Sequence, residues 1–145
     1  MGFWTGLGLG IFDCVIKGVL PVLTARMMDQ DLSVQASAGL LAIAGHNWSP
    51  YIRFTGGRGI ATAIGVLIGL AMWKELLTIA IMGVAGRVLF RDIDLWTIIA
   101  TLTLPLMTLL FQQPIEITYT SIAISMLLVL KRLTANWEKP SDDCS

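Results

Sequence analysis

Six apolar segments, separated by short polar breaks, dominate this chain of 145 residues. They lie at about residues 3–27, 33–46, 60–73, 75–90, 94–111 and 115–131. Apolar runs of this length predict helices that bury their surface in lipid or against one another. Several are shorter than the roughly 20 residues that cross a bilayer straight, so we expect some to span it only in part. The pattern predicts an all-α integral membrane protein, a compact bundle of about six transmembrane or partly spanning helices.

The composition agrees with a membrane protein and excludes other classes. Hydrophobic residues make up 55% of the chain and charged residues 14%, with a mean hydropathy of +0.75, whereas soluble domains carry about 25% charged residues. The formal net charge is zero, so no basic face predicts a nucleic-acid partner, and the lipid bilayer is the expected partner. Cys14 and Cys144 match neither a disulfide framework nor a metal site, and we interpret both as free thiols. No cofactor is expected, and no cleavable signal peptide is recognised, since the first apolar segment lacks a basic start.

The basic residues predict how the segments are oriented. If the segments alternate in direction, Arg26 and Lys74 fall on one side, and the other side collects Arg53, Arg58, Arg87, Arg91, Lys131, Arg132 and Lys139. By the positive-inside rule the richer side is cytoplasmic. A single kinked span over 60–73 and 75–90 would put the last charges on the wrong side, so six passes are favoured. We expect one membrane domain over residues 1–135 and a polar cytoplasmic tail over 136–145.

Residues 45–62 form the only long polar and glycine-rich break in the chain. Three glycines, Gly56, Gly57 and Gly59, surround Arg58 and leave backbone N–H groups open to a tetrahedral oxyanion, while the guanidinium supplies charge. A helix that begins at Ile60 would point its positive end at the same place. The stretch therefore predicts a phosphate-binding loop. The alternative is a simple turn in which Arg58 is one more cytoplasmic charge. The loop lacks the Lys-Ser/Thr ending of a nucleotide P-loop, so ATP hydrolysis is not expected.

Asp13 and Lys17 lie four residues apart in the middle of the first apolar segment. This spacing lets them pair on one helix face. Charged residues at membrane depth are costly and are functional candidates by default; the alternative is a structural ion pair that fixes helix rotation. Gly18 and Pro21 predict close packing and a local kink. A close helix contact is also expected from the small-residue spacing of Gly2, Gly6 and Gly10.

His46 ends the second segment directly before the glycine-rich loop. A histidine at this position has three possible roles: donor to a phosphate, proton shuttle, or orienting group for a substrate hydroxyl. A hydrogen-bonded structural histidine is the alternative. No metal is expected, because no second histidine or thiolate lies at a useful spacing.

The stretch from Gly45 to Thr62 resembles the second signature of the bacterial PlsY family of acyl-phosphate:glycerol-3-phosphate acyltransferases. The family shows a Gly-His, an aromatic-rich turn and then Phe-x-Gly-Gly-Lys-Gly-Val-Ala-Thr, and this chain has Gly45-His46, Phe54 and Gly56-Gly57-Arg58-Gly59-Ile60-Ala61-Thr62. Upstream, Asp13 to Val22 is similar to the family's second membrane helix, and Ala38-Gly39 leads into the motif as in its third. The order and spacing agree over about residues 5–72.

The chain also departs from the family pattern. The family's first signature, a glycine- and asparagine-rich loop after a first membrane helix, is not found, so the chain is expected to be an N-terminally shortened member. Arg58 replaces the lysine of the second signature, which keeps the charge and changes its geometry. The third signature survives only as Arg132 and Asn136.

The resemblance implies transfer of a fatty acyl group from acyl phosphate to the 1-hydroxyl of glycerol 3-phosphate, which forms lysophosphatidic acid for phospholipid synthesis. It implies a multi-pass protein of the bacterial inner membrane with its site facing the cytoplasm. The catalytic residues would be His46, Arg58 and Lys17; the substrate phosphate would be bound by Gly56, Gly57, Arg58, Gly59 and Thr62; the supporting residues would be Asp13, Gly45, Arg132 and Asn136.

Two alternatives remain. One is a catalytically inactive shortened paralogue or a membrane protein that binds lipid phosphate. The other, a transporter component, rests only on Asp13 and Lys17, and the inverted repeats that would support it are not found in the sequence.

Overall fold

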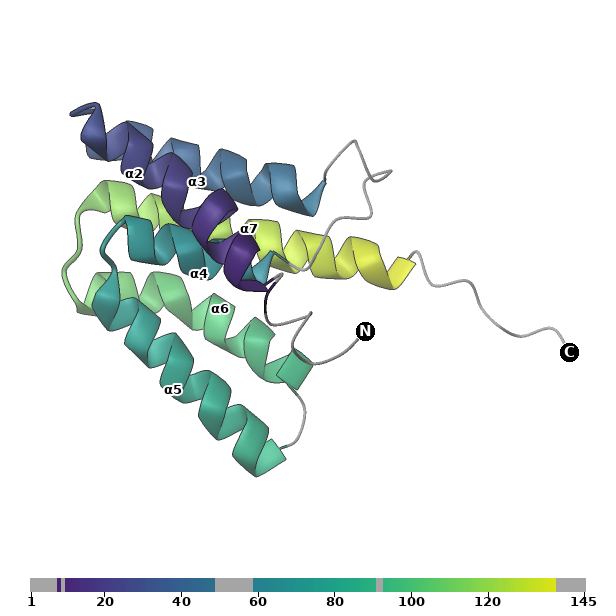
Figure 1. Cartoon of the computed structure of the whole chain (residues 1–145). Helices are drawn as coiled ribbons and strands as arrows, with labels where there is room; N and C mark the ends of the chain where they lie inside the picture. The colour runs from purple at the N-terminus through teal and green to yellow at the C-terminus, as the bar shows by residue number, and fades with distance from the viewer. Residues whose placement is uncertain (1–7, 9, 49–58, 91–92, 138–145) are drawn as a thin grey trace, which may run out of the picture.

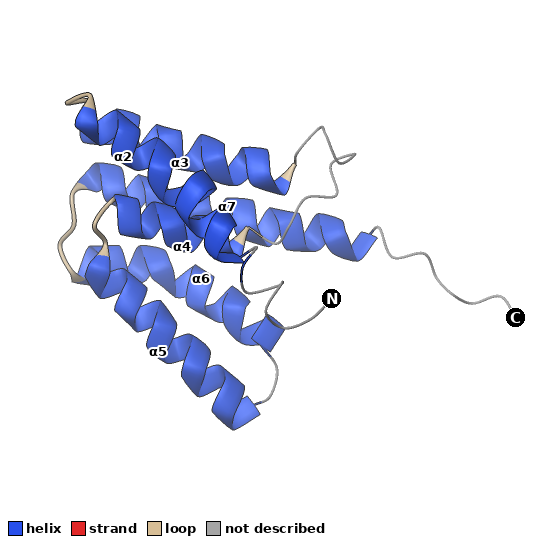
Figure 2. Ribbon diagram, in the orientation of Figure 1, coloured by secondary structure: helices blue, strands red, loops and turns tan. Residues whose placement is uncertain are grey.

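The computed structural model describes residues 8, 10–48, 59–90 and 93–137 of the chain. All regular structure in these residues is helical, as Figure 2 shows, and they contain no strand. The elements in chain order are η1 (Asp13–Val19), α2 (Leu20–Met27), α3 (Leu32–Asn47), α4 (Ile60–Gly69), α5 (Trp73–Phe90), α6 (Ile93–Leu110) and α7 (Ile115–Trp137). The prediction of an all-α bundle is confirmed.

The helices follow the six predicted apolar segments with two differences in length. The helix predicted over 60–73 ends at Gly69, and the last helix runs on from 131 to Trp137. Within the described part of the chain, one stretch, Ile115–Thr134 of α7, is long and apolar enough to cross a membrane by length and composition. Ile60–Gly69 and Ile98–Leu110 are apolar but shorter. These lengths agree with the expectation that some helices span the bilayer only in part.

Tight turns connect the helices at one end of the bundle, on the left in Figure 1. They join α2 to α3, α4 to α5 and α6 to α7, and each contains a residue other than glycine with positive φ: Asp29 at 53°, Ala71 at 57° and Gln112 at 51°. The turn at Ala71 reverses the chain, so α4 and α5 run in opposing directions (Figure 1). Residues 60–90 therefore form two separate helices, α4 and α5, and the alternative of a single kinked span over 60–73 and 75–90 is wrong.

The π-helical segment η1 ends just before Pro21, near which the sequence predicts a kink. Proline has no N–H to donate, and its ring would clash with the carbonyl of the residue four positions earlier, Lys17. In η1 the backbone bonds run to the fifth residue back, as from Leu20 N–H to the Val15 carbonyl. Such π turns are rare and are frequent at functional sites.

Helices η1 and α4 cross with their backbones in direct contact at two glycines. A Cβ atom on Gly18 would lie 2.5 Å from the Thr62 carbonyl oxygen and 2.6 Å from Gly65 Cα. A Cβ atom on Gly65 would overlap the Cys14 carbonyl oxygen. The close packing predicted at Gly18 is confirmed. The contact predicted at Gly10 is not found among the described residues, because none of their atoms lies within 4 Å of the position of its Cβ; Gly2 and Gly6 lie outside the described residues.

Helix α4 lies at the centre of the bundle and contacts η1, α2, α3 and α5. Its side chains Val66 and Leu67 are buried with Val22 of α2, Ile43 of α3 and Ile124 of α7. The outward face of α5 is apolar and exposed, through Leu77, Ile81, Val84 and Val88. An apolar core with an apolar outer face is the pattern that a lipid environment requires.

Glu75 is buried at the turn end of the bundle, with 1% of its surface exposed. Its Oε1 accepts a hydrogen bond of 3.0 Å from Nε2 of Gln113, so it links the first turn of α5 to the segment before α7. Its Oε2 has no hydrogen-bond partner among the described residues. Nearby, the Lys74 ammonium lies 5.7 Å from the centre of the Phe111 ring. The hydrogen bond between Gln113 and Glu75 holds these two segments together at the end of the bundle opposite to the N-terminus of α4.

Candidate functional site

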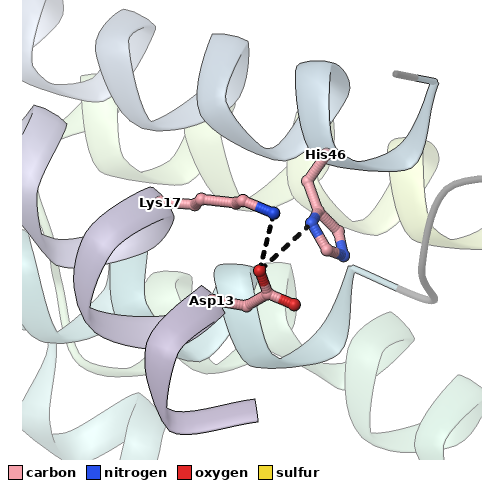
Figure 3. A network of polar contacts seen from close by, with 3 residues as sticks. All are labelled: Asp13, Lys17 and His46. Carbon is pink, nitrogen blue, oxygen red and sulfur yellow. Dashed lines mark ion pairs between the residues drawn. The ribbon is translucent and has the colours of Figure 1, made fainter. Parts of the chain in front are cut away.

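Asp13, Lys17 and His46 meet where η1 passes the last turn of α3 (Figure 3). Lys17 Nζ lies 2.7 Å from Asp13 Oδ1, so the predicted pairing within the first apolar segment is confirmed. The same carboxylate oxygen lies 3.9 Å from His46 Nδ1. The structure thus brings together two predicted catalytic residues and one predicted supporting residue from segments far apart in the sequence.

The geometry orients the imidazole of His46. A distance of 3.9 Å is too long for a hydrogen bond, yet it places the Nδ1 edge of the ring toward the carboxylate, and Figure 3 shows the other ring nitrogen pointing away from Asp13. A carboxylate beside Nδ1 favours a proton on that nitrogen and leaves Nε2 free to accept one. The side chains of His46, Asp13 and Lys17 are 11%, 24% and 46% exposed. The side chain of Lys17 is therefore nearly half exposed, while the ring is nearly buried.

The N-terminus of α4 lies at the same end of the bundle as His46. Gly59 is the N-cap residue, with φ of 70°, a left-handed conformation that favours glycine. The first N–H groups of a helix have no partner within the helix, and its dipole favours negative charge there. Of the predicted phosphate-binding residues, Gly59 caps α4 and Thr62 is fully buried in its first turn. Arg58, Gly56 and Gly57 lie outside the described residues, so their role stays a prediction.

Asn47 is a candidate that the sequence interpretation missed. It is fully buried at the end of α3, next to His46. Its carboxamide packs against Gly59, because a Cβ atom at Gly59 would overlap Asn47 Oδ1. The signal in the sequence was an amide directly after the histidine of an apolar helix. The structure adds that this amide lies over the N-cap of α4.

Lys131 of α7 adds a further buried charge near this end of α3. Only 7% of its surface is exposed, and α7 packs against α3, the helix that carries His46. The sequence interpretation had used Lys131 only as a marker of membrane orientation. Two lysines and one aspartate give these groups a net charge of +1 when His46 is neutral. A positive site of this kind suits an anionic ligand.

The remaining predicted supporting residues are placed less directly. Arg132 is partly buried on α7 next to Lys131. Asn136 lies in the last turn of α7, but its side chain is outside the described residues. Gly45 is exposed, and a Cβ atom there would meet nothing within 4 Å, so packing among the described residues does not require glycine. No group of three or more His, Cys, Asp or Glu side chains that could hold a metal ion occurs in the described part of the chain.

The fold matches that of a known membrane enzyme. A crystal structure of PlsY (YgiH), an integral membrane glycerol 3-phosphate acyltransferase in its glycerol 3-phosphate form, superposes with a TM-score of 0.82 at 26% identity, over 94% of this chain and 68% of that one. Its lysophosphatidic acid form, at 22% identity, shows the same fold with a TM-score of 0.79 over 91% of this chain and 67% of that one. The bundle is therefore an all-α fold of the integral membrane class.

The sequence comparisons give the family. The model of the glycerol-3-phosphate acyltransferase family matches residues 1–139. Relatives of that name include those of Pseudomonas putida strain W619, 42% identical over 83% of this chain, Geotalea daltonii, 34% over 90%, and Endomicrobium trichonymphae, 32% over 83%. The chain belongs to the glycerol-3-phosphate acyltransferase family, as its resemblance to PlsY predicted. It spans 62%, 66% and 60% of the length of these three relatives.

Proposed function

We propose that this chain transfers a fatty acyl group from acyl phosphate to the 1-hydroxyl of glycerol 3-phosphate and forms lysophosphatidic acid. It acts as a multi-pass protein in a bacterial inner membrane, with the site facing the cytoplasm. Beyond family membership, the observation that carries the proposal is the meeting of Asp13, Lys17 and His46. They lie at the same end of the bundle as the N-terminus of α4.

The reaction needs one bond formed and one broken at the acyl carbon. The 1-hydroxyl oxygen attacks the carbonyl carbon, the bond from that carbon to the phosphate oxygen breaks, and inorganic phosphate leaves. The hydroxyl proton passes to Nε2 of His46, which Asp13 orients from the Nδ1 side. Since acyl phosphate is a mixed anhydride with a good leaving group, positioning and charge neutralisation supply much of the rate enhancement. No nucleophilic side chain is required.

The charges and apolar surfaces of the site fit these substrates. Both substrates carry phosphate, and the site combines the helix N-terminus with Lys17 and Lys131, to which the proposal adds Arg58. The apolar helix faces next to the site accommodate the acyl tail. The ammonium of Lys17 neutralises charge that develops on the phosphate oxygen as it leaves.

The test is acyl transfer by purified protein in lipid nanodiscs, with glycerol 3-phosphate as acceptor and either acyl phosphate or acyl-CoA as donor. We expect lysophosphatidic acid from acyl phosphate and none from acyl-CoA. Product from acyl-CoA alone would replace the proposed donor. If the protein binds phosphate and yields no product from either donor, the transferase proposal fails and the alternative of a non-catalytic lipid-phosphate binder is supported.

Arg58→Ala tests the glycine-rich loop in the same assay. We expect it to abolish acyl transfer while the protein still inserts into membranes, because the loop loses its guanidinium. Arg58→Lys, which restores the family residue, should retain or raise the rate. Arg26→Ala is the matched control, since Arg26 is an exposed arginine near the turn end of the bundle. Wild-type rates in Arg58→Ala would remove the loop from the mechanism.

A further inference from the structure

Asn47 and Thr62 are fully buried polar residues whose side chains make no hydrogen bond with a described residue. Among the described residues, no partner is found for Oδ1 and Nδ2 of Asn47 or for Oγ1 of Thr62. Buried polar groups without partners are rare in folded proteins, since each loses its bonds to water and gains nothing in return. Two such residues in neighbouring helices need a physical explanation.

The other buried hydroxyls of this bundle show that the gap at Thr62 is local. Ser121 donates to the Ile117 carbonyl at 2.9 Å, Ser125 to the Thr101 carbonyl at 2.6 Å, and Thr108 to the Pro105 carbonyl at 2.8 Å. Serine and threonine in helices commonly donate to a carbonyl three or four residues back. Because Thr62 makes no such bond with a described residue, its hydroxyl is available to a ligand.

Both residues lie at the N-terminus of α4. The Asn47 carboxamide packs on Gly59, the N-cap residue, and Thr62 lies in the first turn of the helix. Free backbone N–H groups and the positive end of the helix dipole favour an anion at this position. The unpartnered amide is an independent indication of the same site. It presents an N–H donor beside a helix end that already favours negative charge.

We propose that Asn47 is a phosphoryl-binding residue, which donates from Nδ2 to an oxygen of a substrate phosphate at the N-terminus of α4, with Thr62 Oγ1 as a second donor. The inference takes the class of substrate from the proposed function, and it does not depend on the acyl-transfer reaction. The ligand is a phosphate monoester or acyl phosphate group. Glycerol 3-phosphate and acyl phosphate both offer this chemistry, and the experiment separates them.

The test compares wild type with Asn47→Leu, which has a similar volume and no polar atoms. Thermal unfolding of the detergent-solubilised protein is followed against inorganic phosphate, glycerol 3-phosphate and unphosphorylated glycerol. We expect phosphate and glycerol 3-phosphate, but not glycerol, to raise the wild-type midpoint. In Asn47→Leu the dissociation constant for phosphate should rise about 10- to 100-fold, which is the loss expected for one hydrogen bond to a charged group. Without ligand, its midpoint should stay the same or rise, because two unpartnered atoms are removed.

A structural role for Asn47 predicts the opposite result. If the amide only supports the fold, Asn47→Leu lowers the midpoint without ligand and leaves the phosphate affinity unchanged, and the inference is overturned. A wild type that does not respond to phosphate also overturns it. The matched control is Ser125→Ala, which removes a buried hydroxyl that lies within hydrogen-bond distance of the Thr101 and Ser121 carbonyls and should lower the midpoint without changing phosphate affinity.

Further variants keep the test decisive. Where Asn47→Leu does not fold, Asn47→Asp keeps the shape and opposes an anion by charge, so it must lose the response to phosphate; a retained response overturns the inference.

A higher KM for glycerol 3-phosphate alone would assign Asn47 to the acceptor, and a higher KM for acyl phosphate alone to the donor. Phosphate binding through Asn47 in a protein that transfers no acyl group would refute the proposed function and leave this inference standing.

Discussion

Replacing Gly65 by alanine tests the crossing of η1 and α4 most directly. The added Cβ would overlap the Cys14 carbonyl oxygen and would lie 2.8 Å from Gly18 Cα and 3.0 Å from the Cys14 carbonyl carbon, whereas ordinary contacts begin at 3.4 Å. All of these neighbours are backbone atoms, so no side chain can rotate out of the way. The two helices must therefore move apart.

The expected loss in the free energy of unfolding is best measured against a matched control variant. Overpacking in a tight core costs about 1–3 kcal/mol, and backbone neighbours put Gly65→Ala at the upper end of that range. Alanine also gains about 1 kcal/mol over glycine in a helix. Gly83→Ala in α5 has this gain alone, because no described atom lies within 4 Å of its Cβ position. The free energies of unfolding of the two variants should differ by about 3 kcal/mol, with Gly65→Ala the less stable.

The assay is reversible unfolding in mixed micelles titrated with SDS, with acyl transfer measured on the same preparations. Because η1 carries Asp13 and Lys17, separation of the helices should also displace them from His46, and a shift of about 1 Å can cost ~100-fold in rate. Gly83→Ala should keep wild-type activity. Equal stability and activity in the two variants would refute the reasoning, since the contact at Gly65 would then impose no constraint.

Two further predictions concern the buried polar groups. Glu75→Gln removes an ionisable group and should leave the free energy of unfolding unchanged or higher. Gln113→Leu removes the only described partner of Glu75 and should lower the free energy of unfolding by about 3 kcal/mol. Equal losses of stability for the two variants in the SDS titration would contradict this prediction. Asp13→Asn should change stability by no more than about 1 kcal/mol, because the pair with Lys17 is partly exposed. It should lower the rate of acyl transfer ~100-fold through loss of the group that orients the imidazole. The exposed Asp29→Asn is its control for lost charge, and equal rates in the two variants would remove Asp13 from the reaction.

Helix positions could be predicted from hydropathy, but helix ends could not. Helix α4 ends at Gly69 although residues 70–72 are apolar, because the backbone N–H groups of Ala71 and Met72 bond back to the Ile68 and Leu67 carbonyls and form a turn. Apolar composition does not distinguish such a turn from another turn of helix. Helix α7 continues past Lys131 because lysine and arginine are good helix formers. A charge ends an apolar segment without ending a helix.

The candidate site could be predicted where the signal was local. The spacing of Asp13 and Lys17 indicated their pairing, and the apolar run that ends at His46 indicated its place at the end of a helix. Asn47 and Lys131 were missed because burial depends on which face of a helix meets its neighbours, and nearly all faces here are apolar.

The prediction of close packing from glycine spacing failed for a similar reason. The regular spacing that ends at Gly10 is visible within one segment, but a Cβ atom at Gly10 would meet no described atom within 4 Å, whereas Gly18 packs on Gly65 from another helix. Such a contact needs two partners that only the folded chain brings together. Spacing within one segment does not identify the second partner.

The π-helical segment η1 constrains the length of this part of the chain more strictly than its composition. Its exposed apolar positions, Val15 and Ile16, face outward and should accept other hydrophobic residues. Loss of one residue between Cys14 and Pro21 would let the segment wind as a regular α-helix and would turn everything before it by roughly 100° about the helix axis. Asp13 would then leave the side of the helix that faces His46. Insertions and deletions should therefore be far rarer here than substitutions among the proteins that share this site.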